Sequence, residues 1–125
     1  MKPIAPGERR VVNIKDGAFT PYVFEDGATF GDSVLQLEDG LPLGVGFHVY
    51  RMPPGMTSRP HRHNGNEQFL VLEGELIDND GTVFRPGDLV WFRSGTEHCS
   101  HAPNGCLLAV HIADTEITIP GPGEG

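Results

Sequence analysis

Short apolar runs, each ended within a few residues by glycine or proline, restrict the folds open to this chain. The chain has 125 residues, of which 17 are glycine and 11 are proline. Pairs typical of tight turns recur between the runs, such as Asp26-Gly27, Asp80-Gly81 and Asn104-Gly105. No window of about a dozen residues holds a helical period with capping residues. Many short strands at spacings of roughly 8–12 residues predict an all-β barrel or sandwich.

The expected strands are rich in Val, Ile, Leu, Phe and Tyr, which suit a half-buried pleated surface. We expect longer strands at residues 10–14, 33–37, 45–52, 67–73, 88–93 and 106–113, and shorter ones at 19–24, 75–78, 82–84 and 116–119. The length suits one compact domain with one core, which we place at residues 1–119. Residues 120–125 contain only Pro, Gly and Glu, and we expect them to form a flexible tail.

The charge and the hydropathy of the chain argue against several classes of partner. The formal net charge is −8, so neither nucleic acid nor an anionic membrane surface is an expected partner. The N-terminus lacks the apolar segment of a secretory signal, and no apolar run approaches membrane-spanning length. We therefore expect a cytoplasmic protein, with Cys99 and Cys106 as reduced thiols.

Two blocks of residues point to a metal site. Residues 55–74 read Gly-x5-His-x-His-x3-Glu-x6-Gly, and residues 87–98 read Gly-Asp-x6-Gly-x2-His. The side chains that these blocks supply are His61, His63, Glu67 and His98. Neutral imidazoles and a carboxylate are common ligands of zinc, iron, nickel and manganese. We therefore predict that this quartet holds one divalent metal ion.

The spacing explains how the quartet could converge. His61 and His63 are two residues apart, so on a strand they face the same way, with Cα atoms about 6.6 Å apart. The Asn64-Gly65-Asn66 turn signal would redirect the chain so that Glu67 re-enters beside them. On a regular strand, Phe69 would share the face of Glu67 and add an apolar wall. A lone His-x-His is usually a solvated surface pair, but here the spacing, the glycines and the later histidine agree.

Six further side chains are candidates to line a pocket beside the metal: His48, Tyr50, Phe69, Trp91, Arg93 and His111. Each has a plainer alternative. The two histidines can be satisfied barrel residues, and most aromatics in such strands are simply core. The Arg93 guanidinium could meet a substrate carboxylate, or form a surface ion pair with Glu97 or Asp88. His101 would face away from His98 on a strand, and we interpret it as a polar loop residue.

These residues carry a resemblance to the cupin superfamily. Block 55–74 matches the first cupin motif in full, and the second motif is matched at Gly87, Gly95 and His98. The chain departs from the second motif at Arg93, where proline is usual, and at Ala102, where asparagine is usual. The resemblance covers roughly residues 43–113. It implies a double-stranded β-helix, or jelly-roll barrel, that is often dimeric.

The run 67–75, with Asp78, Gly81 and residues 105–108, resembles one branch of this superfamily most. That branch holds the cupin domain of zinc-binding anti-sigma factors and the acetylacetone-cleaving dioxygenases. The resemblance implies metal ligands at His61, His63, Glu67 and His98, although some dioxygenase relatives use histidines alone.

Two classes of function follow from the resemblance. The first is a metal-dependent dioxygenase, with Fe(II) favoured, acting on a small enolisable or phenolic oxygen-bearing substrate. Glu67 would serve as its catalytic base, with His111 as an alternative, and isomerase or lyase chemistry on the same metal is a close variant. The second is a non-catalytic metal-binding sensor or ligand-binding module. In either class we expect a small-molecule ligand and a homodimer.

Overall fold

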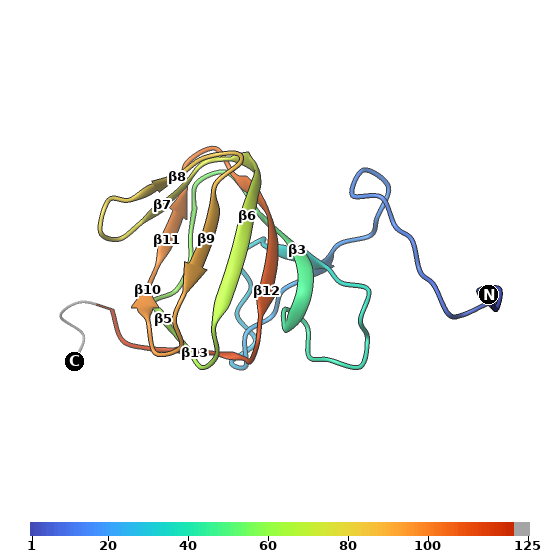
Figure 1. Ribbon diagram of the computed structural model, residues 1–125. Helices are drawn as coiled ribbons and strands as arrows, with labels where there is room; N and C mark the ends of the chain where they lie inside the picture. Colours follow the sequence, from blue (N-terminus) through green and yellow to red (C-terminus); the bar gives the residue numbers. More distant parts are fainter. Residues whose placement is uncertain (122–125) are drawn as a thin grey trace.

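The structure is a computed structural model that describes residues 1–121, and every regular element within that range is a β-strand (Figure 1). This result confirms the all-β prediction. The strands form antiparallel sheets arranged as a jelly-roll. Over the described range, no helix is present that could cross a bilayer.

The strands form one large sheet and two small ones. The large sheet has the order β1-β2-β3-β12-β6-β9, with strands β1 (Thr20–Pro21), β2 (Ser33–Leu35), β3 (Gly46–Met52), β12 (Cys106–Ile112), β6 (Glu67–Gly74) and β9 (Leu89–Phe92). A three-stranded sheet has the order β10-β5-β13, with β10 (Glu97–His98), β5 (His61–His63) and β13 (Glu116–Thr118). A four-stranded sheet has the order β4-β11-β7-β8, with β4 (Met56–Thr57), β11 (Ser100–Ala102), β7 (Leu76–Asp78) and β8 (Val83–Phe84).

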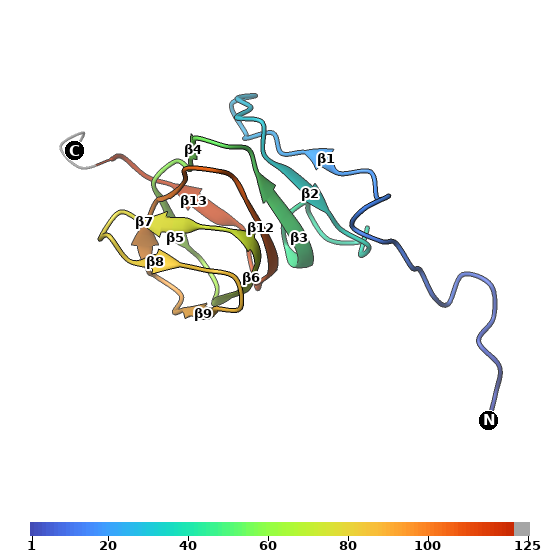
Figure 2. The same cartoon turned by 90° about the horizontal axis from the view of Figure 1, so that it is seen from above.

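Seen from above, the strands enclose a barrel, while β1 and β2 extend the large sheet beyond it (Figure 2). The core lies between the sheets and is built from buried apolar residues: Met52, Met56, Phe69, Val71, Leu76, Ala102, Cys106, Leu108, Val110 and Ile112. Burying these side chains stabilises the fold by the hydrophobic effect, at about 25 cal/mol per Å² of apolar surface removed from water.

Strand β6 shows how alternation directs side chains towards the site. Glu67, Phe69 and Val71 are buried, and Gln68 between them is exposed, as expected for a regular strand with one face inward. The strand ends at Gly74, whose φ of 77° is in the left-handed region. A Cβ atom there would collide with the carbonyl oxygen of Gly105, so this position requires glycine.

The expected strand at residues 10–14 is wrong, because this segment pairs with no other strand. Instead, Asn13 accepts hydrogen bonds from the N–H groups of Asp16 and Gly17 and starts a turn, and Val11 is 82% exposed. The N-terminal segment projects away from the barrel (Figure 1). Of the expected tail at residues 120–125, residues 122–125 lie outside the described range.

Candidate metal centre

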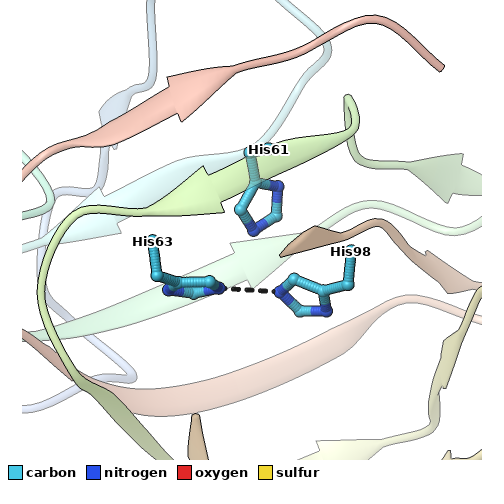
Figure 3. Close-up of side chains that lie close together, drawn as sticks. All are labelled: His61, His63 and His98. Atoms are coloured by element: carbon cyan, nitrogen blue, oxygen red, sulfur yellow. Dashed lines mark hydrogen bonds between the residues drawn. The ribbon is translucent and has the colours of Figure 1, made fainter. Parts of the chain in front are cut away.

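Three histidine side chains from two neighbouring strands meet inside the barrel (Figure 3). His61 and His63 are the first and last residues of β5, so both point to the same face. His98 lies directly opposite His61 in the antiparallel register of β10 and β5. One ring nitrogen of each histidine lies within 4.8 Å of the corresponding nitrogens of the other two. The structure therefore brings these three predicted ligands together.

A glycine turn fixes this arrangement. Gly95 has a φ of 93°, and the turn closes where the Thr96 N–H donates to the Arg93 carbonyl oxygen at 3.1 Å. The Gly95 N–H donates to the His63 carbonyl oxygen at 2.7 Å, and the His63 N–H donates to the Thr96 carbonyl oxygen at 3.0 Å. These bonds hold the end of β5 against the chain that leads into His98.

The hydrogen-bond partners of the Nδ1 atoms direct the other ring nitrogens inward. His61 Nδ1 donates to the Arg59 carbonyl oxygen at 2.8 Å. His98 Nδ1 donates to the two carboxylate oxygens of Asp78 at 3.1 and 3.2 Å. These partners assign the proton to Nδ1 and leave a lone pair on each Nε2. His63 Nε2 lies 2.9 Å from His98 Nε2.

A divalent metal fits this set of donors. With metal–nitrogen bonds of about 2.0–2.1 Å, two imidazoles on one ion place their nitrogens about 2.9 Å apart at a right angle and about 3.4 Å apart at a tetrahedral angle. The separation of 2.9 Å between the His63 and His98 nitrogens agrees with the first value. Neutral imidazoles suit zinc, iron and nickel alike, so the donors indicate a metal without selecting one.

Asp78 contacts His98, and our sequence analysis did not assign it to the site. Its side chain is buried, and one of its oxygens also accepts a hydrogen bond from Ser100 Oγ at 2.6 Å. A carboxylate on the outer nitrogen of a metal-binding histidine fixes the orientation of the ring and raises its basicity. The sequence held one signal for it: Asp78 shares the inward face of β7 with buried Leu76, where a charged residue is unusual.

Glu67 lies beside His63, on the other side of its ring from His98. Glu67 Oε2 is 3.3 Å from His63 Nδ1, whereas His63 Nε2 faces His98. Glu67 thus belongs to a second group with His63 and Glu116, whose potential ligand atoms also lie within 4.8 Å of one another. One imidazole ring cannot direct both of its nitrogens at the same ion. The assignment of Glu67 as a fourth ligand therefore stays a prediction.

Glu116 is the second residue that sequence analysis missed. It lies directly opposite His63 in the register of β13 and β5, and its Oε1 is 3.6 Å from His61 Nε2. Burial raises the pKa of Glu67 well above its usual value, and the charge of Glu116 and a hydrogen bond between the two carboxyl groups raise it further. The Glu67 carboxylate is therefore a stronger proton acceptor than a carboxylate in water.

His63 has the environment of a neutral ligand. Burial lowers the pKa of its imidazole to about 4, so the ring carries no charge at neutral pH. Its ring also stacks on Phe92, with centroids 5.5 Å apart and planes at 19°. The Phe92 centroid lies 4.5 Å from that of His98. This aromatic wall lowers the local dielectric and strengthens electrostatic interactions at the site.

A cavity of about 720 Å³ opens beside the cluster. The predicted residues that line it are His48, Tyr50, His61, Glu67, Phe69 and His98. His48 is buried, its Nδ1 donates to the Gly46 carbonyl oxygen at 3.0 Å, and burial lowers its pKa. His48 is therefore a neutral, hydrogen-bonded wall residue that also faces the cavity.

The other candidates do not line this cavity. Trp91 and His111 are exposed, and both lie in one cross-strand row on the outer face of the large sheet. The exposed Arg93 guanidinium lies 6.0 Å from the centre of the Trp91 ring. His101 Nδ1 is 2.8 Å from Thr57 Oγ1, in an exposed contact away from the histidine cluster. Cys99 and Cys106 are free thiols.

Comparison with known proteins supports this reading of the motifs. The cupin domain family matches residues 48–108, a span that holds both histidine blocks. The chain carries a cupin domain across these residues. Its two departures from the second cupin motif leave the site intact: the turn after Arg93 still closes without proline, and Ala102 is buried in the core.

Solved structures share the fold of this cupin. An acetylacetone dioxygenase from Acinetobacter johnsonii superposes with a TM-score of 0.69 at 16% identity, over 98% of this chain and 84% of the other. A chain from the complex of Rhodobacter sphaeroides SigE with the anti-sigma ChrR superposes with a TM-score of 0.59 at 22% identity, over 78% of this chain and 50% of the other.

A curated protein also matches part of the cupin. Ribosomal oxygenase 2 from Mus musculus is 29% identical over 54% of this chain, and the chain spans 20% of the length of that relative. The solved structures, at their low sequence identities, establish the fold.

Proposed function

We propose that this cupin is a metal-dependent dioxygenase of a small enolisable or phenolic substrate. The observation that carries the proposal is the convergence of three imidazoles beside a cavity of about 720 Å³ that is large enough for a small organic molecule. The similarity to the acetylacetone dioxygenase fold supports the same reading. Both atoms of dioxygen would enter the products when a carbon–carbon bond of the substrate is cleaved.

Different residues of the chain would have different roles in such a reaction. His61, His63 and His98 would hold one divalent ion, and an Fe(II) ion there supplies the redox chemistry that lets dioxygen react with an organic substrate. Burial raises the pKa of Glu67, so its carboxylate would accept the proton that the substrate loses when it binds as an enolate or phenolate. Phe69 and Phe92 pack against each other and form the apolar wall, which limits access of water.

Oxygen uptake after metal reconstitution tests this function. The metal-free protein would be loaded anaerobically with Fe(II) and given β-diketones, catechols and hydroxy-ketones in an oxygen electrode. We expect substrate-dependent uptake with Fe(II), and none with Zn(II) or in His98→Ala. Tight zinc binding together with no uptake for any of the three substrate classes would refute the dioxygenase proposal.

A non-catalytic sensor is the second candidate, favoured by the similarity to a chain of the SigE–ChrR complex. In that case the metal would be zinc, and its binding would change the affinity of the cupin for a partner molecule. Zinc loading that changes stability while Fe(II) supports no turnover would favour this candidate. A sigma-factor gene beside the gene for this chain would favour it as well, and a catabolic operon would favour the enzyme.

We further propose a homodimer formed through the outer face of the large sheet. Phe47 on β3, Leu89 on β9 and Trp91 on β9 are 67%, 74% and 53% exposed, which is unusual for such large apolar side chains on one sheet. A second copy of the chain would cover them. Light scattering should give a dimer that Trp91→Lys dissociates, and a monomer at all concentrations would refute the proposal.

The two free thiols support a cytoplasmic location.

A further inference from the structure

A buried carboxylate lines the same cavity as the histidines and has one oxygen without a partner. Asp32 directly precedes β2, and its residue is only 3% exposed. The Tyr50 hydroxyl donates to Asp32 Oδ2 at 2.5 Å. Within residues 1–121, nothing donates to Asp32 Oδ1, although less than 1 Å² of this atom is accessible to solvent. Most buried carboxylate oxygens do have a donor, so this one calls for an explanation.

The surrounding backbone holds Asp32 firmly in this position. Its carbonyl oxygen accepts a hydrogen bond from the Tyr22 N–H at 3.0 Å. The next residues join β2 to β3, with Val34 directly opposite Tyr50. Tyr50 stays protonated, because burial first and the charges of Asp32 and Glu116 next raise its pKa well above its usual value. Tyr50 is therefore a permanent donor to Oδ2, and Oδ1 is the oxygen of this carboxylate that lacks a donor.

The charge of the cavity lining also favours a ligand that donates hydrogen bonds. The carboxyl groups among its lining residues belong to Glu25, Asp26, Asp32, Glu67 and Glu116. Of the described residues that line it, Arg59 is the one with a permanently positive side chain, and its guanidinium already contacts Asp26 at 3.0 Å. A ligand group that donates hydrogen bonds, above all a cationic one, is therefore favoured over an anionic group away from the metal.

We propose that Asp32, held by Tyr50, is a specificity site that binds a hydroxyl or ammonium donor of the substrate while the oxygen end of the substrate lies at the histidine cluster. This inference rests on the proposed function for the oxygen end. It defines the substrate as a small molecule with a metal-binding oxygen group, an apolar middle and a hydrogen-bond donor at its other end. Neither cupin motif contains Asp32 or Tyr50, so this site lies outside the residues that identify the superfamily.

Matched catechols test the proposal without turnover. Zn(II)-loaded protein would be titrated anaerobically, by calorimetry, with 4-alkylcatechols, their ω-hydroxy and ω-amino analogues of equal chain length, and the corresponding ω-carboxylates. A hydrogen bond to a buried charge predicts that the hydroxy or amino member binds roughly ten- to a hundredfold more tightly than the alkyl member of equal length. The carboxylates should bind most weakly of all.

Two variants separate a hydrogen bond to Asp32 from a general effect of charge. In Asp32→Asn, the hydroxy or amino analogue should bind within about twofold of the alkylcatechol of equal length. The reason is that the amide is neutral and can turn its NH2 group towards the ligand. Asp26→Asn removes the same charge from the lining, but that carboxylate already accepts hydrogen bonds from Arg59 and the Ala28 N–H. Asp26→Asn should keep the preference.

The outcomes distinguish this proposal from the dioxygenase proposal. A preference that Asp32→Asn abolishes supports the specificity site even if Fe(II)-loaded protein consumes no oxygen. The proposal would be overturned if the wild-type protein bound the alkyl, hydroxy and amino analogues equally well. It would also be overturned if the protein bound no catechol, or bound the carboxylates more tightly. A preference that persists in folded Asp32→Asn would also overturn it, and the wild-type ratio alone decides the matter if this variant does not fold.

Discussion

Removal of the Asp78 carboxylate is the most direct test of the metal centre, because this residue acts on the metal only through His98. In the structure, His98 Nδ1 donates to both Asp78 oxygens at 3.1 and 3.2 Å, and Ser100 Oγ donates to one of them at 2.6 Å. Asp78→Ala removes all three hydrogen bonds and frees the His98 ring to rotate. Asp78→Asn keeps one acceptor oxygen but removes the charge.

The expected loss follows from this geometry. Losing the outer carboxylate partner of a metal-binding histidine costs roughly ten- to a hundredfold in metal affinity, or about 1.4–2.7 kcal/mol. We expect Asp78→Ala near the upper end of that range, because it also leaves the buried Ser100 hydroxyl and His98 Nδ1 without a partner. Asp78→Asn should lie near the lower end, because it loses the charge that raises the basicity of the ring.

Competition with a chromophoric chelator measures the zinc affinity of each variant at neutral pH. Asp80→Asn is the matched control, because Asp80 is exposed and its side chain accepts a hydrogen bond from the Thr82 N–H at 2.9 Å, outside the cluster. Circular dichroism would establish that each metal-free variant is folded. A folded Asp78→Ala protein with the zinc affinity of the wild type would refute the role of His98 as a ligand held by Asp78.

Three further predictions concern the histidines and the thiols. His61→Ala should lower metal occupancy at least about tenfold with the barrel still folded, and unchanged metal stoichiometry in the purified variant would remove His61 from the ligand set. In the metal-free protein, the His63 pKa of about 4 lies below the unfolded value of about 6.5, so the unfolded state binds more protons between these values. The contribution of His63 to stability should therefore fall by up to about 3 kcal/mol as the pH drops from 6.5 to 4, and a His63→Gln variant with an equally steep loss in urea titrations would contradict this account. Burial raises the pKa of the Cys106 thiol to about 11, so a thiol reagent at pH 8 should modify partly exposed Cys99 quickly and Cys106 slowly; equal rates would contradict the burial of Cys106.

Much of the fold could be predicted because strands and turns leave local signals. The expected strands at 45–52, 67–73 and 106–113 correspond to β3, β6 and β12, the central strands of the large sheet. Their apolar residues alternate or run continuously, and turn residues mark their ends. The expected strand at 10–14 failed because apolar residues alone do not make a strand without a neighbour to pair with.

Strands β4, β10 and β11 could not be predicted in this way. β4 and β10 have two residues each, and β11 has three, which is too few for any periodicity to appear. Their pairing depends on partners far away in the sequence, such as Thr57 opposite His101. The histidine motif nevertheless identified His61 and His63 on β5 and His98 on β10. It could do so because the motif is defined by spacing along the sequence and does not depend on strand periodicity.

The sequence by itself determined the all-β fold and the three histidines that meet. The alternation of apolar and polar residues, the turn residues and the spacing of the ligands are all local features of the sequence. Only the tertiary structure decided which other side chains join them. Asp78, Glu116 and Asp32 come from separate strands or strand ends, and the one local signal, the spacing of Asp78 from Leu76, does not show which side chains it meets. Sheet register places Glu116 opposite His63, and the packing around buried Asp32 leaves one of its oxygens without a partner. These contacts arise only when distant segments pack together, so no local reading of the chain could supply them.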